Sequence, residues 1–176
     1  MNRRRRVMPN IDERLLPVGT NRPGTPLQAE GLIIHSTATP GASAEDEAQY
    51  FSTGNRRSSA HYFVDWDSIV RTIPESEVAW HAGPQANGRF LSIEMCEPKR
   101  NTPEADEEFA HVWGATVDLA ADICRRYGWS TDVIHSHKWV TETLGGTDHK
   151  GPDSYLTEYN RTWDELAADI AGVLSI

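Results

Sequence analysis

The sequence contains little cysteine and no long apolar run, and each shortage excludes a class of protein. Two cysteines among 176 residues, Cys96 and Cys124, are too few for a disulfide framework. Both lie in apolar patterns, so we expect small buried side chains, and the sequence does not decide whether they could pair. No apolar stretch approaches the roughly 20 residues that a membrane-spanning helix needs, so we expect no membrane insertion. The basic start lacks the apolar stretch of a secretory signal.

Positive charge is also scarce outside the beginning of the chain. Residues 1–25 contain six arginines against Asp12 and Glu13, a local charge of +4. Because the whole chain has a formal charge of −9, the remaining residues carry −13. An acidic body argues against a partner of double-stranded nucleic acid, which normally meets a basic face. A short basic terminus is most often a solvated tail, and we interpret this one in that way.

The order of apolar patterns predicts one α/β domain with a central mixed β-sheet flanked by helices. Residues 1–29 contain four prolines and little periodicity, so we expect an extended arm leading into a domain of residues 30–176. Residues 44–53 suggest a short helix, and 138–160 a long irregular segment rich in Gly, Thr, Asp and Pro. Expected strands cover residues 31–35, 59–65, 69–73, 91–97 and 132–135.

Two further helices carry clear signals at their ends. Residues 104–127 repeat apolar side chains at three- and four-residue steps, with Thr102 as the expected cap and Gly128 as the expected stop. The last helix should begin at Thr162, because Glu165 follows three residues later and completes a capping box.

Seven histidines offer nitrogen ligands, and two of them follow strands. His35 closes the strand 31–35, and His137 comes just after the strand 132–135. Histidines at the ends of two strands could point into one cleft and bind zinc with a position left for water. Their separation of about a hundred residues carries no metal-binding signal by itself, so ordinary hydrogen-bonded histidines are the alternative for each.

Glu94 is the sharpest single residue of the sequence. It is a carboxylate within the otherwise apolar run Leu91-Ser92-Ile93-Glu94-Met95-Cys96. A carboxylate there is either paired or serves as an acid or base with a raised pKa. The structural alternative is that its side of the strand faces solvent, and we favour the functional interpretation.

Six short motifs, in this order, resemble the type-2 N-acetylmuramoyl-L-alanine amidases, which are relatives of peptidoglycan-recognition proteins and common as phage endolysins. The resemblance covers roughly residues 30–160, and each motif is moderately specific, whereas the ordered set is strong. The motifs are Leu32-Ile33-Ile34-His35-Ser36-Thr37, Ser59-Ala60-His61-Tyr62-Phe63-Val64-Asp65, Ala79-Trp80-His81-Ala82-Gly83, Ser92-Ile93-Glu94, Ser136-His137-Lys138-Trp139 and Gly145-Gly146-Thr147-Asp148-His149.

The resemblance implies a Zn²⁺-dependent hydrolase that cuts the amide between N-acetylmuramic acid and L-alanine of peptidoglycan. It implies that His35 and His137 are zinc ligands and that Glu94 is the acidic residue beside the attacking water. The segment Trp80-His81-Ala82-Gly83 matches one that lines the substrate groove, where His81 is either structural or helps to hold the substrate. His61 is a second candidate substrate contact.

The third ligand is where the sequence departs from the family pattern. The family places Asp or Cys directly before a proline, but here Gly151 precedes Pro152, and glycine has no ligand atom. The possible substitutes are Asp148, His149 and Asp153, and we take Asp148. His149 fits the position of the family's catalytic helper, two residues before the expected ligand.

Two rival functions remain at this stage. A non-catalytic peptidoglycan-binding module with a degraded zinc site is favoured by Gly151. A glycosidase with two carboxylates has no motif in its favour. Without a secretory signal, we expect a phage or prophage lysin that stays in the host cytoplasm before release to the cell wall, or a cytoplasmic recycling enzyme. The oligomeric state is not readable from the sequence.

Overall fold

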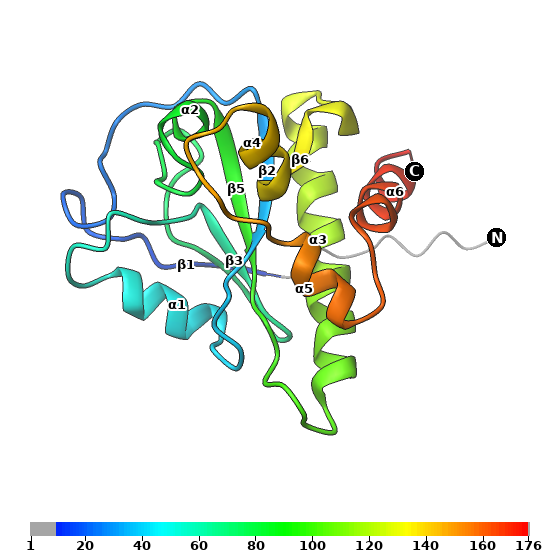
Figure 1. Ribbon diagram of the computed structural model, residues 1–176. Coiled ribbons are helices and arrows are strands. Elements are labelled where there is room, and N and C mark those ends of the chain that lie inside the picture. The colour runs from blue at the N-terminus through cyan, green and yellow to red at the C-terminus, as the bar shows by residue number, and fades with distance from the viewer. Residues whose placement is uncertain (1–9, 176) are drawn as a thin grey trace.

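A computed structural model describes residues 10–175 and confirms the α/β domain with a mixed sheet (Figure 1). Six strands form one sheet in the order β1-β4-β3-β5-β2-β6, with β3 and β4 antiparallel and every other neighbouring pair parallel. The strands are β1 (Ile11–Glu13), β2 (Gly31–Ser36), β3 (Tyr62–Val64), β4 (Ile69–Arg71), β5 (Phe90–Met95) and β6 (Ile134–Ser136).

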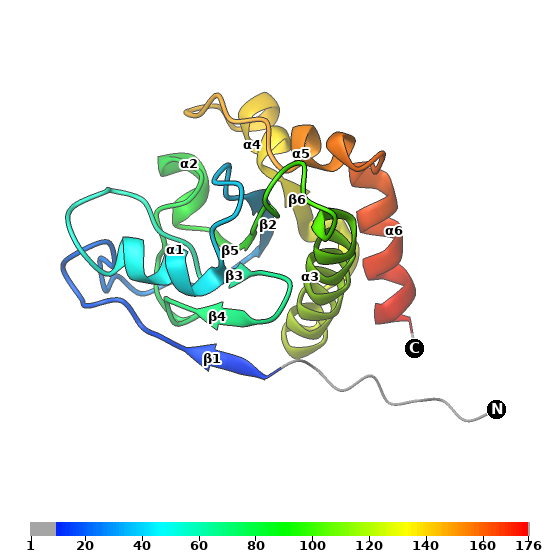
Figure 2. The ribbon, with the colours of Figure 1, turned by 90° about the horizontal axis from the view of Figure 1, so that it is seen from below.

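Helices cover both faces of this sheet, as Figure 2 shows. The long helix α3 packs on β3 and β5 and carries α6 behind it, while α1 and α2 lie over the opposite face. The helices are α1 (Ala44–Phe51), α2 (Pro84–Asn87), α3 (Ala105–Tyr127), α4 (His137–Thr143), α5 (Asp153–Glu158) and α6 (Trp163–Leu174). None of the helices within residues 10–175 is long and apolar enough to cross a membrane.

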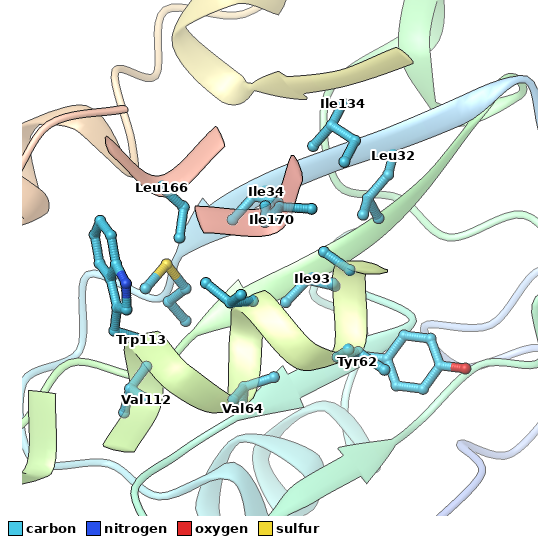
Figure 3. Packing of buried hydrophobic residues seen from close by; sticks show 14 of the residues in the cluster. Leu32, Ile34, Tyr62, Val64, Ile93, Val112, Trp113, Ile134, Leu166 and Ile170 are labelled. Carbon is cyan, nitrogen blue, oxygen red and sulfur yellow. The ribbon is translucent and has the colours of Figure 1, made fainter. Parts of the chain in front are cut away.

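The main hydrophobic core lies between the sheet and the pair α3 and α6 (Figure 3). Alternate residues of a strand point to opposite faces. In β2, Leu32 and Ile34 therefore enter this core, while Ile33 packs with α2 and α4 on the other face. Cys124 belongs to the main core and Cys96 to a smaller cluster under α1, and both are buried free thiols. One face of the sheet thus stabilises the fold, and the other is available for polar side chains.

Several expected boundaries differ from the structure. The helix expected from 104 begins at Ala105 without a side-chain cap, because the Thr102 hydroxyl donates to the Lys99 carbonyl instead. The segment expected to be irregular, 138–160, contains most of α4 and all of α5. Both helices are short, and the glycine-rich segment between them obscures the apolar period that indicates a helix. The capping box of Thr162 and Glu165 and the stop at Gly128 are confirmed.

The segment expected to be an extended arm, 1–29, is attached to the domain over its described part. Strand β1 pairs with β4 as an edge strand, and the Leu16 side chain is 1% exposed in a cluster with Ile73 and Ala79. Arg22 donates two hydrogen bonds of 2.7 Å to the Glu77 carboxylate. The basic run Arg3–Arg6 lies outside the described residues, so our interpretation of it as a solvated tail stays a prediction.

Asn21 joins this segment to the loop after α1. Its side chain is fully buried and makes four hydrogen bonds, which exhaust its donors and acceptors. The amide nitrogen donates to the carbonyls of Phe51 and Gly54, and the amide oxygen accepts from the backbone N–H groups of Arg56 and Arg57. The Asn21 side chain therefore anchors the loop after α1 to the segment before β2.

We predict that Asn21→Ala lowers the free energy of unfolding by about 1–3 kcal/mol, because it removes four part-buried hydrogen bonds that hold the loop. Urea unfolding of the variant and the wild type measures the difference. The matched control is Asn55→Ala in the same loop, where the side chain is exposed and we expect a change within about 0.5 kcal/mol. Equal effects of the two substitutions would contradict the role of Asn21.

Candidate active site

A cleft of about 890 Å³ opens on the face of the sheet opposite the main core. It lies at the carboxyl ends of the central strands, between α1 and the loops that follow β4 and α4. The titratable side chains that line it include His35, Glu47, His81, Glu94, His137 and His149. Open parallel sheets commonly bind ligands at this end of their strands.

The parallel pairing of the central strands explains how distant residues meet there. In the register of β2 and β5, His35 lies beside Glu94, and both follow the alternation that points away from the main core. On the other side of β2, Ile34 pairs with Ser136, so His137 follows directly at the end of β6. Ser136 caps α4 by accepting a hydrogen bond from the Trp139 N–H, which sets the turn on which His137 sits.

A hydrogen-bond chain fixes the tautomer of His35. The Nε2 atom of His81 lies 3.1 Å from the Phe90 carbonyl, which can only accept, so this nitrogen carries the hydrogen. Burial, together with the neighbouring His61, lowers the pKa of His81 to about 3, so its Nδ1 is an acceptor for the His35 Nε2–H at 3.0 Å. Burial and the adjacent His81 and His137 hold the pKa of His35 well below its ordinary value. Neutral His35 consequently presents an Nδ1 lone pair.

That lone pair points at a second histidine. The Nδ1 atoms of His35 and His137 are 2.8 Å apart, and the Nε2 atom of His137 lies 3.0 Å from the Thr147 hydroxyl. Burial, then the nearby His149, lowers the pKa of His137 to about 4, while Asp148 acts in the opposite direction. The His149 ring stacks on that of His137 with centroids 5.0 Å apart. Two ring nitrogens this close need a shared proton or a cation.

These two histidines fit a zinc site as two of its ligands. Zinc binds imidazole nitrogen at about 2.0–2.1 Å, and a ligating histidine usually donates its other N–H to a protein group. His35 meets that requirement through His81, and the loop holding Thr147 gives His137 a partner. Within residues 10–175, however, no group of three or more His, Cys, Asp or Glu side chains is arranged to hold a metal ion. Two of the nitrogen donors that a zinc site needs are therefore in place, and a third protein ligand does not join them in the described residues.

Glu94 faces the same cleft. Burial, and then the negative charges of Glu47 and Glu97, raises the pKa of its carboxyl to about 8. Its Oε2 atom is buried without a hydrogen-bond partner. The half-buried side chain therefore lines the cleft with one oxygen unpaired, and a carboxyl with such a raised pKa holds and releases a proton near neutral pH.

The other candidate site residues differ in exposure and in position relative to the cleft. His81 lines the cleft, but His61 is fully buried, with one nitrogen bound to the Ser92 hydroxyl and the other to the Glu77 carbonyl. The expectation that His61 contacts substrate is therefore not supported by the geometry, which gives it a structural role. Asp148 is exposed between Thr147 and His149, and Asp153 begins α5. Gly151, the residue before the proline, lies against Ser36 at the end of β2.

Two lining residues escaped the sequence analysis. Glu47 is buried on α1, where burial raises its pKa, and its carboxylate accepts from the Thr39 hydroxyl. Within α1 it is one of three acidic residues in a row, so its pattern resembles a helix start. Thr147 belongs to one of the six motifs, but nothing in the sequence shows that its hydroxyl reaches His137.

Comparisons with known proteins show the family of this chain. Residues 25–154 match the protein family described as N-acetylmuramoyl-L-alanine amidase. The chain is 38% identical over 162 residues to N-acetylmuramoyl-L-alanine amidase CwlL of Bacillus licheniformis, covering 82% of this chain and 44% of that protein. It is 30% identical over 145 residues to the bifunctional autolysin of Staphylococcus aureus, covering 78% of this chain and 11% of that protein. The chain thus spans less than half the length of these relatives.

Solved structures share the fold. The Staphylococcus aureus hydrolase AmiA, in complex with its ligand, superposes with a TM-score of 0.79 at 29% identity, covering 96% of this chain and 84% of that chain. A mutant endolysin from Bacillus subtilis superposes with a TM-score of 0.76 at 28% identity, covering 93% of this chain and 99% of that chain. The expected arrangement of a mixed sheet flanked by helices is therefore confirmed.

Proposed function

This chain belongs to the N-acetylmuramoyl-L-alanine amidase family, and from that membership we propose that it hydrolyses the amide between N-acetylmuramic acid and L-alanine in peptidoglycan. The observation that carries the proposal is the meeting of His35, His137 and Glu94 at one end of a cleft. A cleft of about 890 Å³ lies in the upper part of the range of about 300–1,000 Å³ for ligand pockets, which leaves room for part of a muramyl peptide.

We propose that His35 and His137 hold a Zn²⁺ ion and that Asp148 supplies the third ligand. The support is the Nδ1 lone pair of His35 and its 2.8 Å approach to His137. Asp148 belongs to the same short loop as Thr147, which already contacts His137. When bound, zinc polarises the substrate carbonyl and lowers the pKa of a bound water.

Glu94 carries the proton in this proposal. Hydrolysis adds water to the lactyl carbonyl carbon and breaks its bond to the L-alanine nitrogen, so one proton must move from the water to that nitrogen. The Glu94 carboxylate accepts the proton and then delivers it to the leaving amine, a role worth about 10²–10⁴-fold in rate. His149 is exposed at the cleft beside His137. It assists that proton transfer or stabilises the negatively charged oxygen of the tetrahedral intermediate.

We further propose that the protein acts as a phage or prophage lysin that stays in the host cytoplasm until it is released to the cell wall. The supporting observation is the fold shared with an endolysin at 28% identity over nearly the whole of that chain. A cytoplasmic recycling enzyme with the same site is the alternative.

A non-catalytic peptidoglycan-binding module is the second candidate function. Two observations favour it: Gly151 stands where the family has a ligand, and only two metal donors converge within the described part of the chain. Glu94 argues against it, because a buried carboxyl oxygen without a hydrogen-bond partner at the cleft has no evident role in a binding module.

We predict that Glu94→Gln lowers the rate of muropeptide cleavage by at least about 100-fold while zinc stays bound, because glutamine cannot accept the proton. Chromatography of the released peptides measures the rate, and atomic absorption measures zinc per chain. Glu142→Gln, on the exposed side of α4, is the matched control and should leave both values unchanged. Retained activity in Glu94→Gln would remove this residue from the mechanism.

The third ligand is tested by zinc affinity rather than by rate. We expect Asp148→Asn to weaken zinc binding at least about tenfold, because an amide oxygen is a poorer ligand than a carboxylate. Competition with a coloured chelator gives the dissociation constant. The same change at Asp153 should have little effect. Loss at Asp153 with retention at Asp148 would transfer the ligand role to Asp153.

A further inference from the structure

The loop between α1 and β3 forms part of the wall of the cleft. Arg57 and Ser58 from this loop line the cleft together with Gly19 and Thr20 from the segment before β2. Two segments that are distant in the sequence therefore meet at this wall of the cleft.

Arg57 is held in an unusual backbone conformation at this wall. Its φ is +54°, in the left-handed region that side-chain-bearing residues seldom adopt. Its N–H donates to the Asn21 amide oxygen at 3.2 Å, and the preceding Arg56 N–H donates to the same atom at 2.8 Å. The buried Asn21 thus fixes the direction in which the chain presents the Arg57 side chain.

The two adjacent arginines have different surroundings. The Arg56 guanidinium lies over the Tyr50 ring, 3.8 Å from its centroid, and Arg56 does not line the cleft. Arg57 is exposed and lines the cleft, and its guanidinium has no hydrogen bond or ion pair with any residue of 10–175. The remainder of the chain from residue 26 carries a charge of −13, so an arginine without an acidic partner is notable here.

We propose that Arg57 forms a subsite of the cleft that binds an ionised carboxylate of the stem peptide of a muramyl peptide. The inference rests on the proposed function. The sugar part of that substrate has no ionised group, because the lactyl carboxyl is consumed in the amide. The peptide does carry carboxylates, at its acidic residue and its C-terminus. A guanidinium binds a carboxylate through two parallel hydrogen bonds, so Arg57 selects the peptide and sets its direction in the cleft.

The test compares Arg57→Gln with the matched control Arg56→Gln, which removes the same charge one residue earlier and outside the cleft. Glutamine keeps a Cβ at position 57, so the backbone preference changes little. The substrates are a soluble muramyl tripeptide and the same compound with its peptide carboxylates converted to carboxamides. Cleavage gives KM and kcat, and titration calorimetry gives Kd for each pair.

With the carboxylate substrate we expect Arg57→Gln to raise KM and Kd by about 10- to 100-fold, the loss of a hydrogen bond to a charged group. The kcat should change less than about threefold, because the Arg57 side chain makes no hydrogen bond or ion pair with His35, Glu94 or His137. Arg56→Gln should match the wild type. With the carboxamide substrate, wild type and Arg57→Gln should give equal values. Added salt should weaken binding of the carboxylate to the wild type more than to Arg57→Gln.

Equal KM and Kd for wild type and Arg57→Gln on the carboxylate substrate would overturn the inference. An equal loss on both substrates would do the same, since the effect would then not depend on the carboxylate. If the wild type cleaves neither compound, the proposed amidase function fails, and Kd still tests Arg57. If the wild type cleaves both compounds with equal KM, the amidase function is supported and the carboxylate subsite is contradicted.

Discussion

The parallel pairing of β2 with both β5 and β6 is the constraint on which the site depends. It brings the carboxyl ends of three strands to one edge, so that His35, Glu94 and His137 meet although about a hundred residues separate the first from the last. The register also fixes the face. Because His35 and Glu94 follow Ile33 and Ser92 in alternation, both point away from the main core. A shift of one residue would bury them against α3.

The two faces of the sheet differ in the side chains that they carry and in what those side chains contribute. The face against α3 and α6 is filled by apolar side chains, and it supplies the hydrophobic stabilisation (Figure 3). The opposite face holds buried polar groups whose burial costs free energy unless they are paired. His61 and His81 meet that requirement through hydrogen bonds to Ser92 and to the carbonyls of Glu77 and Phe90. Glu94 does not, because its buried Oε2 atom has no partner. Its proposed role as the carrier of the proton is consistent with such a cost, since violations of the pairing rule concentrate at functional sites.

Much of this could be predicted from the sequence, for physical reasons that differ by element. The helices 105–127 and 163–174 have long apolar periods and clear end signals, so both were predictable within a residue or two. Helices α4 and α5 are too short to show a period, and α4 is specified by its Ser136 cap and by packing on β2. The presence of a site followed from motifs. The hydrogen bonds around the site could not be predicted. The contact of His81 with His35 joins residues 46 positions apart, and the bonds of Asn21 to the loop 51–57 join residues 30 to 36 positions apart.

The measurement that tests the central claim most directly is the chemistry of the ends that the purified protein produces on peptidoglycan, with and without a zinc chelator. The account predicts new L-alanine amino termini without new reducing sugars. Those termini should disappear with the chelator and return when zinc is added. New reducing sugars would contradict the amidase in favour of a glycosidase. No new ends, with the protein still sedimenting with peptidoglycan, would show that the two-histidine site has lost its activity and that the chain is a recognition module.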